Sequence, residues 1–187
     1  RDLVTWSCFV MSENLEEPGF EVIEICDGFE IRKYVDTIQA RVVTKGTGYH
    51  NSTGAFRRIA SYIFGRNDQS QNIAMTAPVH MWESGDSSIM AFTMPSKYVM
   101  GDLPKPHDSG VELLHVKGGF MAVLKFSGLS HRRKSLRMMR KLRSMIENNG
   151  FIAHSETILA VYDNPTTTLP FLRRNEIIQP IEWDKGE

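Results

Sequence analysis

The chain is poor in the residues and runs that mark several special classes of protein. Its 187 residues include only two cysteines, Cys8 and Cys26, which stand far apart and outside any CxxC or Cys/His cluster. We therefore expect free thiols, with neither a disulfide framework nor a cysteine metal site. No apolar run approaches the ~18 residues of a membrane-spanning helix. We expect no transmembrane segment.

The chain also lacks an excess of charge of either sign. Lysine plus arginine and aspartate plus glutamate each total 22, so the formal net charge is zero. Any electrostatic preference for a partner must then come from local patches of charge. This balance disfavours a general nucleic-acid binder and a polybasic membrane binder.

Catalytic and metal-binding motifs are missing too. The sequence has no GxSxG, HExxH or GxxxxGK[ST] motif, and no GxGxxG that opens a helix. Six histidines occur singly, without the spacing of metal ligands; they are His50, His80, His107, His115, His131 and His154. The motifs thus predict neither a catalytic residue nor a metal site.

Length and composition are those of one globular domain. Hydrophobic residues make up 41% and charged residues 24% of the chain, which are ordinary values. The polar stretch before Phe20 predicts an N-terminal extension over 1–19 and a single domain over 20–187. Because the chain starts at Arg1 and an apolar segment follows, we expect a cytoplasmic protein, or an organellar one after removal of a targeting segment.

Alternation of apolar and polar residues predicts short strands in the first half of the domain. The expected strands are 20–25, 29–35, 38–44, 73–81 and 88–94. Between them, Ser52 or Thr53 can cap a helix that runs to Gly65, with Phe56, Ile59, Ala60 and Ile63 on one face. Four methionines, Met75, Met81, Met90 and Met94, lie on the two later strands, where we expect them to fill the core.

The second half of the domain repeats the first. A shift of 82 positions places Gly28 on Gly110 and keeps the strand-turn-strand pattern in phase, which defines half-repeats over about 20–100 and 110–182. A second helix is expected over 130–149, followed by strands over 156–162 and 175–181. We therefore predict an α+β fold: a curved, barrel-like, mostly antiparallel sheet of about nine strands with two helices, related by a pseudo-two-fold β-β-α-β repeat.

Several motifs in this order resemble the SOUL haem-binding protein family. They are FEIRKY at 29–34, IAMTAPV at 73–79, FTMPS at 92–96, VLKFSG at 123–128, YDNP at 162–165 and RNE at 174–176. The match covers about 20–181 and is closer to the plant and microbial type than to the vertebrate p22 type. The resemblance implies non-enzymatic, reversible and non-covalent binding of haem or another porphyrin, as a carrier, buffer or sensor. It also implies a fold similar to bacterial effector-binding domains.

The resemblance further implies an apolar cleft between the first helix and the region before the last strand. Its walls would be Phe56, Ala60, Leu169 and Phe171, with Arg57 and Arg173 as partners of the propionates. The remaining positions of the cleft are Thr53 and Ser61, which stand, like Leu169, where basic residues are expected. One branch of the family has a histidine as its proposed axial ligand where this chain has Lys33, so His50 and His80 are the nearest candidate ligands.

Two other functions remain open from the sequence. The second helix carries Arg133, Arg137 and Arg140 on one face, which suits an acidic protein partner. A small hydrolase or tetrapyrrole-modifying enzyme would need a carboxylate beside an aromatic hydroxyl or indole, and Glu112, Tyr162 and Trp82 are the candidates on strands.

Overall fold

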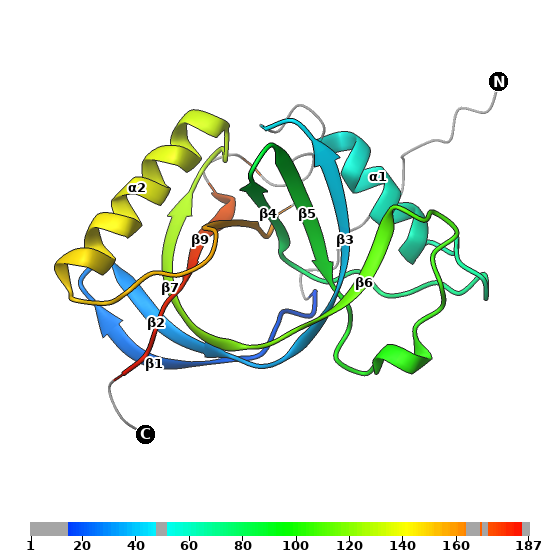
Figure 1. Ribbon diagram of the computed structural model, residues 1–187, viewed down its shortest axis with the longest axis horizontal. Coiled ribbons are helices and arrows are strands. Elements are labelled where there is room, and N and C mark those ends of the chain that lie inside the picture. Colours follow the sequence, from blue (N-terminus) through cyan, green and yellow to red (C-terminus); the bar gives the residue numbers. More distant parts are fainter. Residues whose placement is uncertain (1–14, 48–51, 164–168, 170–171, 185–187) are drawn as a thin grey trace.

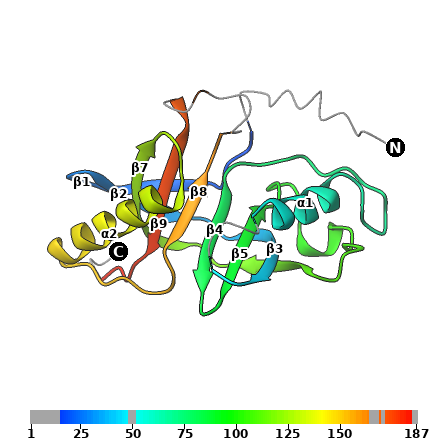
Figure 2. The same ribbon diagram turned by 90° about the horizontal axis from the view of Figure 1, so that it is seen from above.

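A nine-stranded antiparallel sheet forms the body of the protein. The computed structural model describes residues 15–47, 52–163, 169 and 172–184. In these residues the strand order is β1-β2-β7-β9-β8-β4-β5-β3-β6, and the sheet curls into a half-barrel that carries both helices on one face (Figures 1 and 2). This is the α+β architecture that the sequence predicts.

The elements have the following bounds. The strands are β1 (Phe20–Cys26), β2 (Phe29–Tyr34), β3 (Thr37–Lys45), β4 (Val79–Ser84), β5 (Ser87–Thr93), β6 (Val111–Val116), β7 (Gly119–Ser127), β8 (Ile158–Val161) and β9 (Arg174–Pro180). The helices are α1 (Ser52–Ile63) and α2 (Arg132–Asn148), with a short 3-10 helix η2 (Met100–Asp102).

The internal repeat is present in the structure. A shift of 82 positions takes the bounds of β2 onto β6 and those of β3 onto β7. Each half contributes the first strand of the repeat, β2 or β6, to the other half. Strand β2 pairs with β7, and β6 pairs with β3. The halves also meet at the centre of the sheet, where β4 pairs with β8.

Each helix covers the strands of its own half. The apolar stripe predicted for α1 is confirmed, with Ile59 and Ile63 buried against β3 and β5. On α2, Leu142 and Ile146 are fully buried against residues of β7 and β9. Gly65 and Gly150 follow the two helices with φ of 96° and 76°, the left-handed conformation in which helices commonly end.

The expected strand over 73–81 is wrong in its first part, since β4 begins only at Val79. Pro78 has no N–H to donate to a ladder. Polar groups of this segment form hydrogen bonds outside a strand ladder. Ile73 N donates to Ile63 O at 2.8 Å, and Thr76 Oγ1 donates to Thr93 O at 2.5 Å. Residues 73–78 therefore connect α1 to the sheet as an irregular segment.

The first described residues lie against the face of the sheet opposite the helices. Leu15 packs on a buried cluster that includes Val123 and Ala160. Glu16 binds through both its backbone and its side chain, since Ala77 N donates to Glu16 O at 2.9 Å and Ser96 N donates to Glu16 Oε1 at 2.7 Å. Residues 15–19, which the sequence assigns to an extension, thus contact the sheet.

Truncation of Leu142 should destabilise the fold through the contact of α2 with the sheet. Leu142 has no exposed surface, so Leu142→Ala leaves a cavity and should lower the free energy of unfolding by about 3 kcal/mol. Urea denaturation followed by circular dichroism measures the change. The control is Leu136→Ala on the same helix, where the side chain is 38% exposed and the loss should stay below ~1 kcal/mol. Equal losses would contradict this view of the core.

Candidate functional site

A cavity of about 340 Å³ lies between α2 and the start of α1, above β4 and β5. Its apolar lining comes from both helices and both strands, namely Ala55, Met81, Trp82, Ile89, Met90, Leu136 and Met139. Its polar lining comes from Thr44, Ser52, Glu83, Ser88, Arg132, Arg143, Ser155, Glu156 and Thr157. The size lies within the range of small-molecule sites, ~300–1,000 Å³.

One face of α2 forms a wall of this cavity. Arg132, Leu136, Met139 and Arg143 all line it, and their spacing places them in one stripe along the helix. Neither arginine forms an ion pair with another residue that the structure describes. The wall therefore offers two free guanidinium groups at the ends of an apolar stripe.

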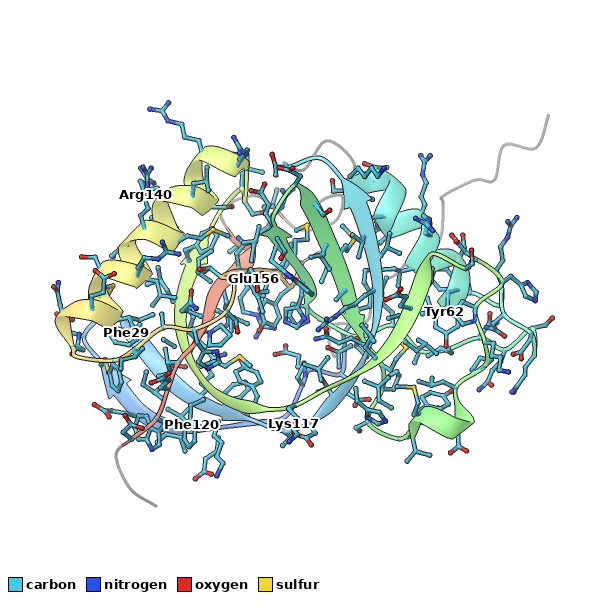
Figure 3. All side chains as sticks on the ribbon, viewed as in Figure 1. Phe29, Tyr62, Lys117, Phe120, Arg140 and Glu156 are labelled. Carbon is cyan, nitrogen blue, oxygen red and sulfur yellow. The ribbon has the colours of Figure 1, made fainter. Side chains whose placement is uncertain are left out.

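The other arginines of α2 point elsewhere. Arg133, Arg137 and Arg140 are exposed and do not line the cavity. Arg140 points away from the body of the molecule (Figure 3). The face on which the sequence suggests an acidic protein partner is thus distinct from the wall of the cavity.

The cavity carries two carboxylates from elements other than α2. Glu83 is on β4 and Glu156 is on the segment that leads into β8. Ser84 Oγ donates to Glu156 Oε1 at 2.6 Å, and this hydrogen bond lowers the pKa of Glu156. Figure 3 shows Glu156 on the inner side of α2. The walls of the cavity therefore carry opposite charges.

A second cavity of about 420 Å³ continues past the first along α2. The two share Arg143 and Ser155. Phe151, Ile152 and Gln179 are also among its lining residues. Arg143 therefore lies between two hollows and borders both.

The predicted cleft residues on α1 do not line either cavity. Phe56 packs on the core, with its ring centroid 5.4 Å from that of Phe92, and Ala60 is buried. Thr53 and Arg57 are exposed, and Ser61 is half-buried. Instead, α1 contributes Ser52 and Ala55 to the lining of the cavity.

Of the predicted cleft residues near the last strand, Leu169 and Arg173 are described and Phe171 is not. Leu169 is 57% exposed. Arg173 directly precedes β9, which pairs with β7 and β8, whereas α1 contacts β3, β5 and β6. Strand pairing thus does not bring Arg173 to α1.

A buried ionic cluster lies on the face of the sheet opposite the helices. The Arg32 guanidinium donates to Glu176 Oε1 at 3.0 Å and to Oε2 at 3.1 Å, and both side chains are almost fully buried. The Tyr162 hydroxyl donates to Glu176 Oε2 at 2.5 Å. Burial and the charge of Glu176 raise the pKa of Tyr162. Burial alone would lower the pKa of Arg32, but the bond to Glu176 raises it.

Of the three residues suggested for a hydrolase, Glu112 and Trp82 lie beside Arg41, and Tyr162 contacts a different carboxylate. Glu112 is in register with Arg41, and the Arg41 guanidinium carbon lies 4.9 Å from the centroid of a Trp82 ring. Tyr162 instead contacts Glu176, a carboxylate that the sequence argument did not select. The only sequence signal for Glu176 is its place in the RNE motif.

Of the two candidate iron ligands, only His80 lies within the described residues, and His50 lies outside them. His80 is 8% exposed on β4 and lines neither cavity. Its Nδ1 atom has no hydrogen-bond partner among the described residues. Within the same residues, no group of three or more His, Cys, Asp or Glu side chains is arranged to hold a metal ion. No described helix has the length and apolar character needed to cross a bilayer.

The family model of the SOUL heme-binding proteins matches residues 15–180 of this chain. The match extends over most of the sequence and begins at Leu15, the first residue that the structure describes. The chain belongs to the SOUL heme-binding protein family. A search of curated proteins returns no match.

Solved structures share the fold at very low sequence identity. The C-terminal domain of EcmrR has a TM-score of 0.64 and 8% identity, over 82% of this chain and 96% of that one. An uncharacterized conserved protein from Listeria innocua gives 0.63 and 11%, over 82% and 92%. A hydrolase from the same organism gives 0.57 and 11%, over 82% and 91%. At such identities the likeness defines the fold alone.

Buried His80 should make the protein less stable in acid. Burial lowers the pKa of His80 from 6.5 to about 4, so between these values the unfolded chain binds more protons than the folded one. The contribution of His80 to the free energy of unfolding is fully present above pH ~6.5. It is lost as the pH falls towards ~4, and the loss amounts to about 3 kcal/mol. Urea midpoints measured across this range should fall less in His80→Gln than in the parent. Parallel curves would show that His80 does not contribute.

Removal of the Glu176 charge should be costly because it leaves Arg32 buried without its main partner. Glu176→Gln should lower the free energy of unfolding by about 3 kcal/mol. The control is Lys125→Gln, which removes the exposed partner of Glu30 and should cost less than ~1 kcal/mol. Urea denaturation measures both. A loss below ~1 kcal/mol for Glu176→Gln would mean that Glu30, which also pairs with Arg32, is enough to stabilise the buried guanidinium.

Proposed function

We propose that this protein binds haem or a related tetrapyrrole without modifying it, in the cavity between α1 and α2, and acts as a carrier, buffer or sensor. The observation that carries the proposal is the cavity itself, with its apolar floor and its two unpaired arginines on one wall. Membership of the SOUL heme-binding protein family supports the ligand class.

The lining suits a flat, apolar ring that carries acid groups. Burial of the ring against Met81, Met90 and Met139 would contribute about 25 cal/mol per Å² of apolar surface. Methionine side chains adapt their shape to a ligand at little cost. Arg132 and Arg143 would bind the carboxylates through charge-assisted hydrogen bonds, which orient the ring with its acid edge towards α2.

Coordination of iron is not required for this mode of binding. Among the described residues that line the cavity, none is histidine or cysteine. Met81, Met90 and Met139 carry thioethers, which are the soft donors on these walls for a bound metal. We therefore expect reversible, non-covalent binding in which the metal is optional.

The cleft implied by the family resemblance is an alternative place for the same ligand. It would use Thr53, Phe56, Arg57, Ala60 and Ser61 of α1, together with Leu169, Phe171 and Arg173. Because Ala60 is buried and Phe56 packs on Phe92, a ligand there would have to displace α1 from the sheet or lie on its outer side. The cavity beside α2 needs no such movement.

Titration of the purified protein with haemin and with metal-free protoporphyrin tests the proposal. We expect saturable one-to-one binding of both ligands, with dissociation constants within about threefold of each other, because the ring and the acid groups provide the affinity. Absorbance of the Soret band and porphyrin fluorescence report the binding.

Variants locate the site. Arg143→Glu should weaken both ligands at least tenfold, since it replaces attraction by repulsion at one wall. Arg140→Glu is the matched control on the outer face of α2 and should change the affinity less than twofold. Met139→Asp should also abolish binding, and circular dichroism checks that each variant is folded.

Three results would overturn the proposal in different ways. Equal effects of Arg143→Glu and Arg140→Glu would mean that only the net charge of α2 matters. Binding lost in Phe56→Asp but retained in Met139→Asp would move the ligand to the alternative cleft. Non-saturable binding of both ligands would remove the function altogether.

A further inference from the structure

The two sides of the cavity differ in charge, and this difference bears on which ligands it accepts. The α2 side carries Arg132 and Arg143, and the other elements carry Glu83 and Glu156. A ligand that binds its acid groups to α2 therefore has carboxylates of the other elements around the rest of its ring.

Glu156 is held in position at this edge. Ser84, at the end of β4, donates a hydrogen bond to its carboxylate at 2.6 Å from 72 residues away in the sequence. Among the described residues, Glu156 has no cation within ion-pair distance. As an exposed carboxylate, it is negatively charged at neutral pH. The charge of Glu156 is thus not neutralised by an ion pair within the described residues.

We infer that the cavity selects tetrapyrroles whose acid groups all lie on one edge of the ring, and that Glu156 is the residue that disfavours acid groups on the opposite edge. This inference rests on the proposed function, since it concerns the ligand of the same site. Haem, protoporphyrin and mesoporphyrin carry two propionates on one edge. Coproporphyrin carries four, distributed around the ring.

The physical reason is repulsion between like charges at the exposed edges of the cavity. With two propionates at Arg132 and Arg143, the other two propionates of coproporphyrin lie on the side of Glu83 and Glu156. Carboxylates that approach within several Å of each other repel more in a protein cleft than in water. Added salt screens the part of this repulsion that reaches the solvent.

The sharpest pair of probes is mesoporphyrin and coproporphyrin. Both are metal-free and lack vinyl groups, and two ethyl groups of mesoporphyrin replace two of the propionates of coproporphyrin. Fluorescence titration should show coproporphyrin binding about tenfold more weakly at low salt. The difference should shrink as salt is added.

The variant that tests the role of Glu156 is Glu156→Gln, which keeps the shape of the side chain and removes its charge. It should strengthen coproporphyrin binding and reduce the difference between the two probes to about threefold or less. Glu182→Gln is the matched control, because Glu182 is exposed and lines neither cavity. It should leave the difference unchanged.

The outcomes separate this inference from the proposed function. If neither probe binds, the proposed function fails. If mesoporphyrin binds at the cavity but the difference between the probes is the same in the parent, Glu156→Gln and Glu182→Gln, the selectivity of Glu156 is refuted while the binding site stands. Tighter binding of coproporphyrin than of mesoporphyrin by the parent would also refute the selectivity.

Discussion

The exchange of first strands between the two halves is the constraint on which the rest of the structure depends. Because β2 pairs with β7 and β6 with β3, each half completes the sheet of the other. The sheet then runs without interruption from β1 to β6, and both helices must pack on the same face of it (Figure 2). The cavity lies where the two helices on one curved surface leave β4 and one end of β5 uncovered.

Much of this fold could be read from the sequence. The repeat at a shift of 82 positions reproduces the bounds of β2, β3, β6 and β7, because alternating burial on a sheet leaves a period of two in the sequence. The segment before β4 could not be read, since its apolar residues follow the pattern of a strand although Thr76 and Ile73 bind elsewhere. Pattern alone does not show where a hydrogen bond goes.

The candidate site was less predictable than the fold. The sequence shows that α2 is basic and that Met81 and Met90 lie in predicted strands, but the combination of Arg132, Arg143 and Met81 in one cavity depends on how α2 packs on the sheet. The positions expected on α1 came from the family resemblance, and they include Phe56 but not Ala55, which lines the cavity. Glu156 carries no signal at all, since its partner Ser84 is distant in the sequence.

The repeat also has a consequence for the symmetry of the site. At the shift that relates the two halves, Arg143 of α2 corresponds to Ser61 of α1, and Leu136 corresponds to Gly54. A cavity near the axis between two equal halves would present the same wall twice and would hold an asymmetric ligand in two equivalent orientations. The divergence of the two helices breaks this degeneracy. One orientation then becomes the more stable, and a bound ring would present the same edge to solvent in every molecule.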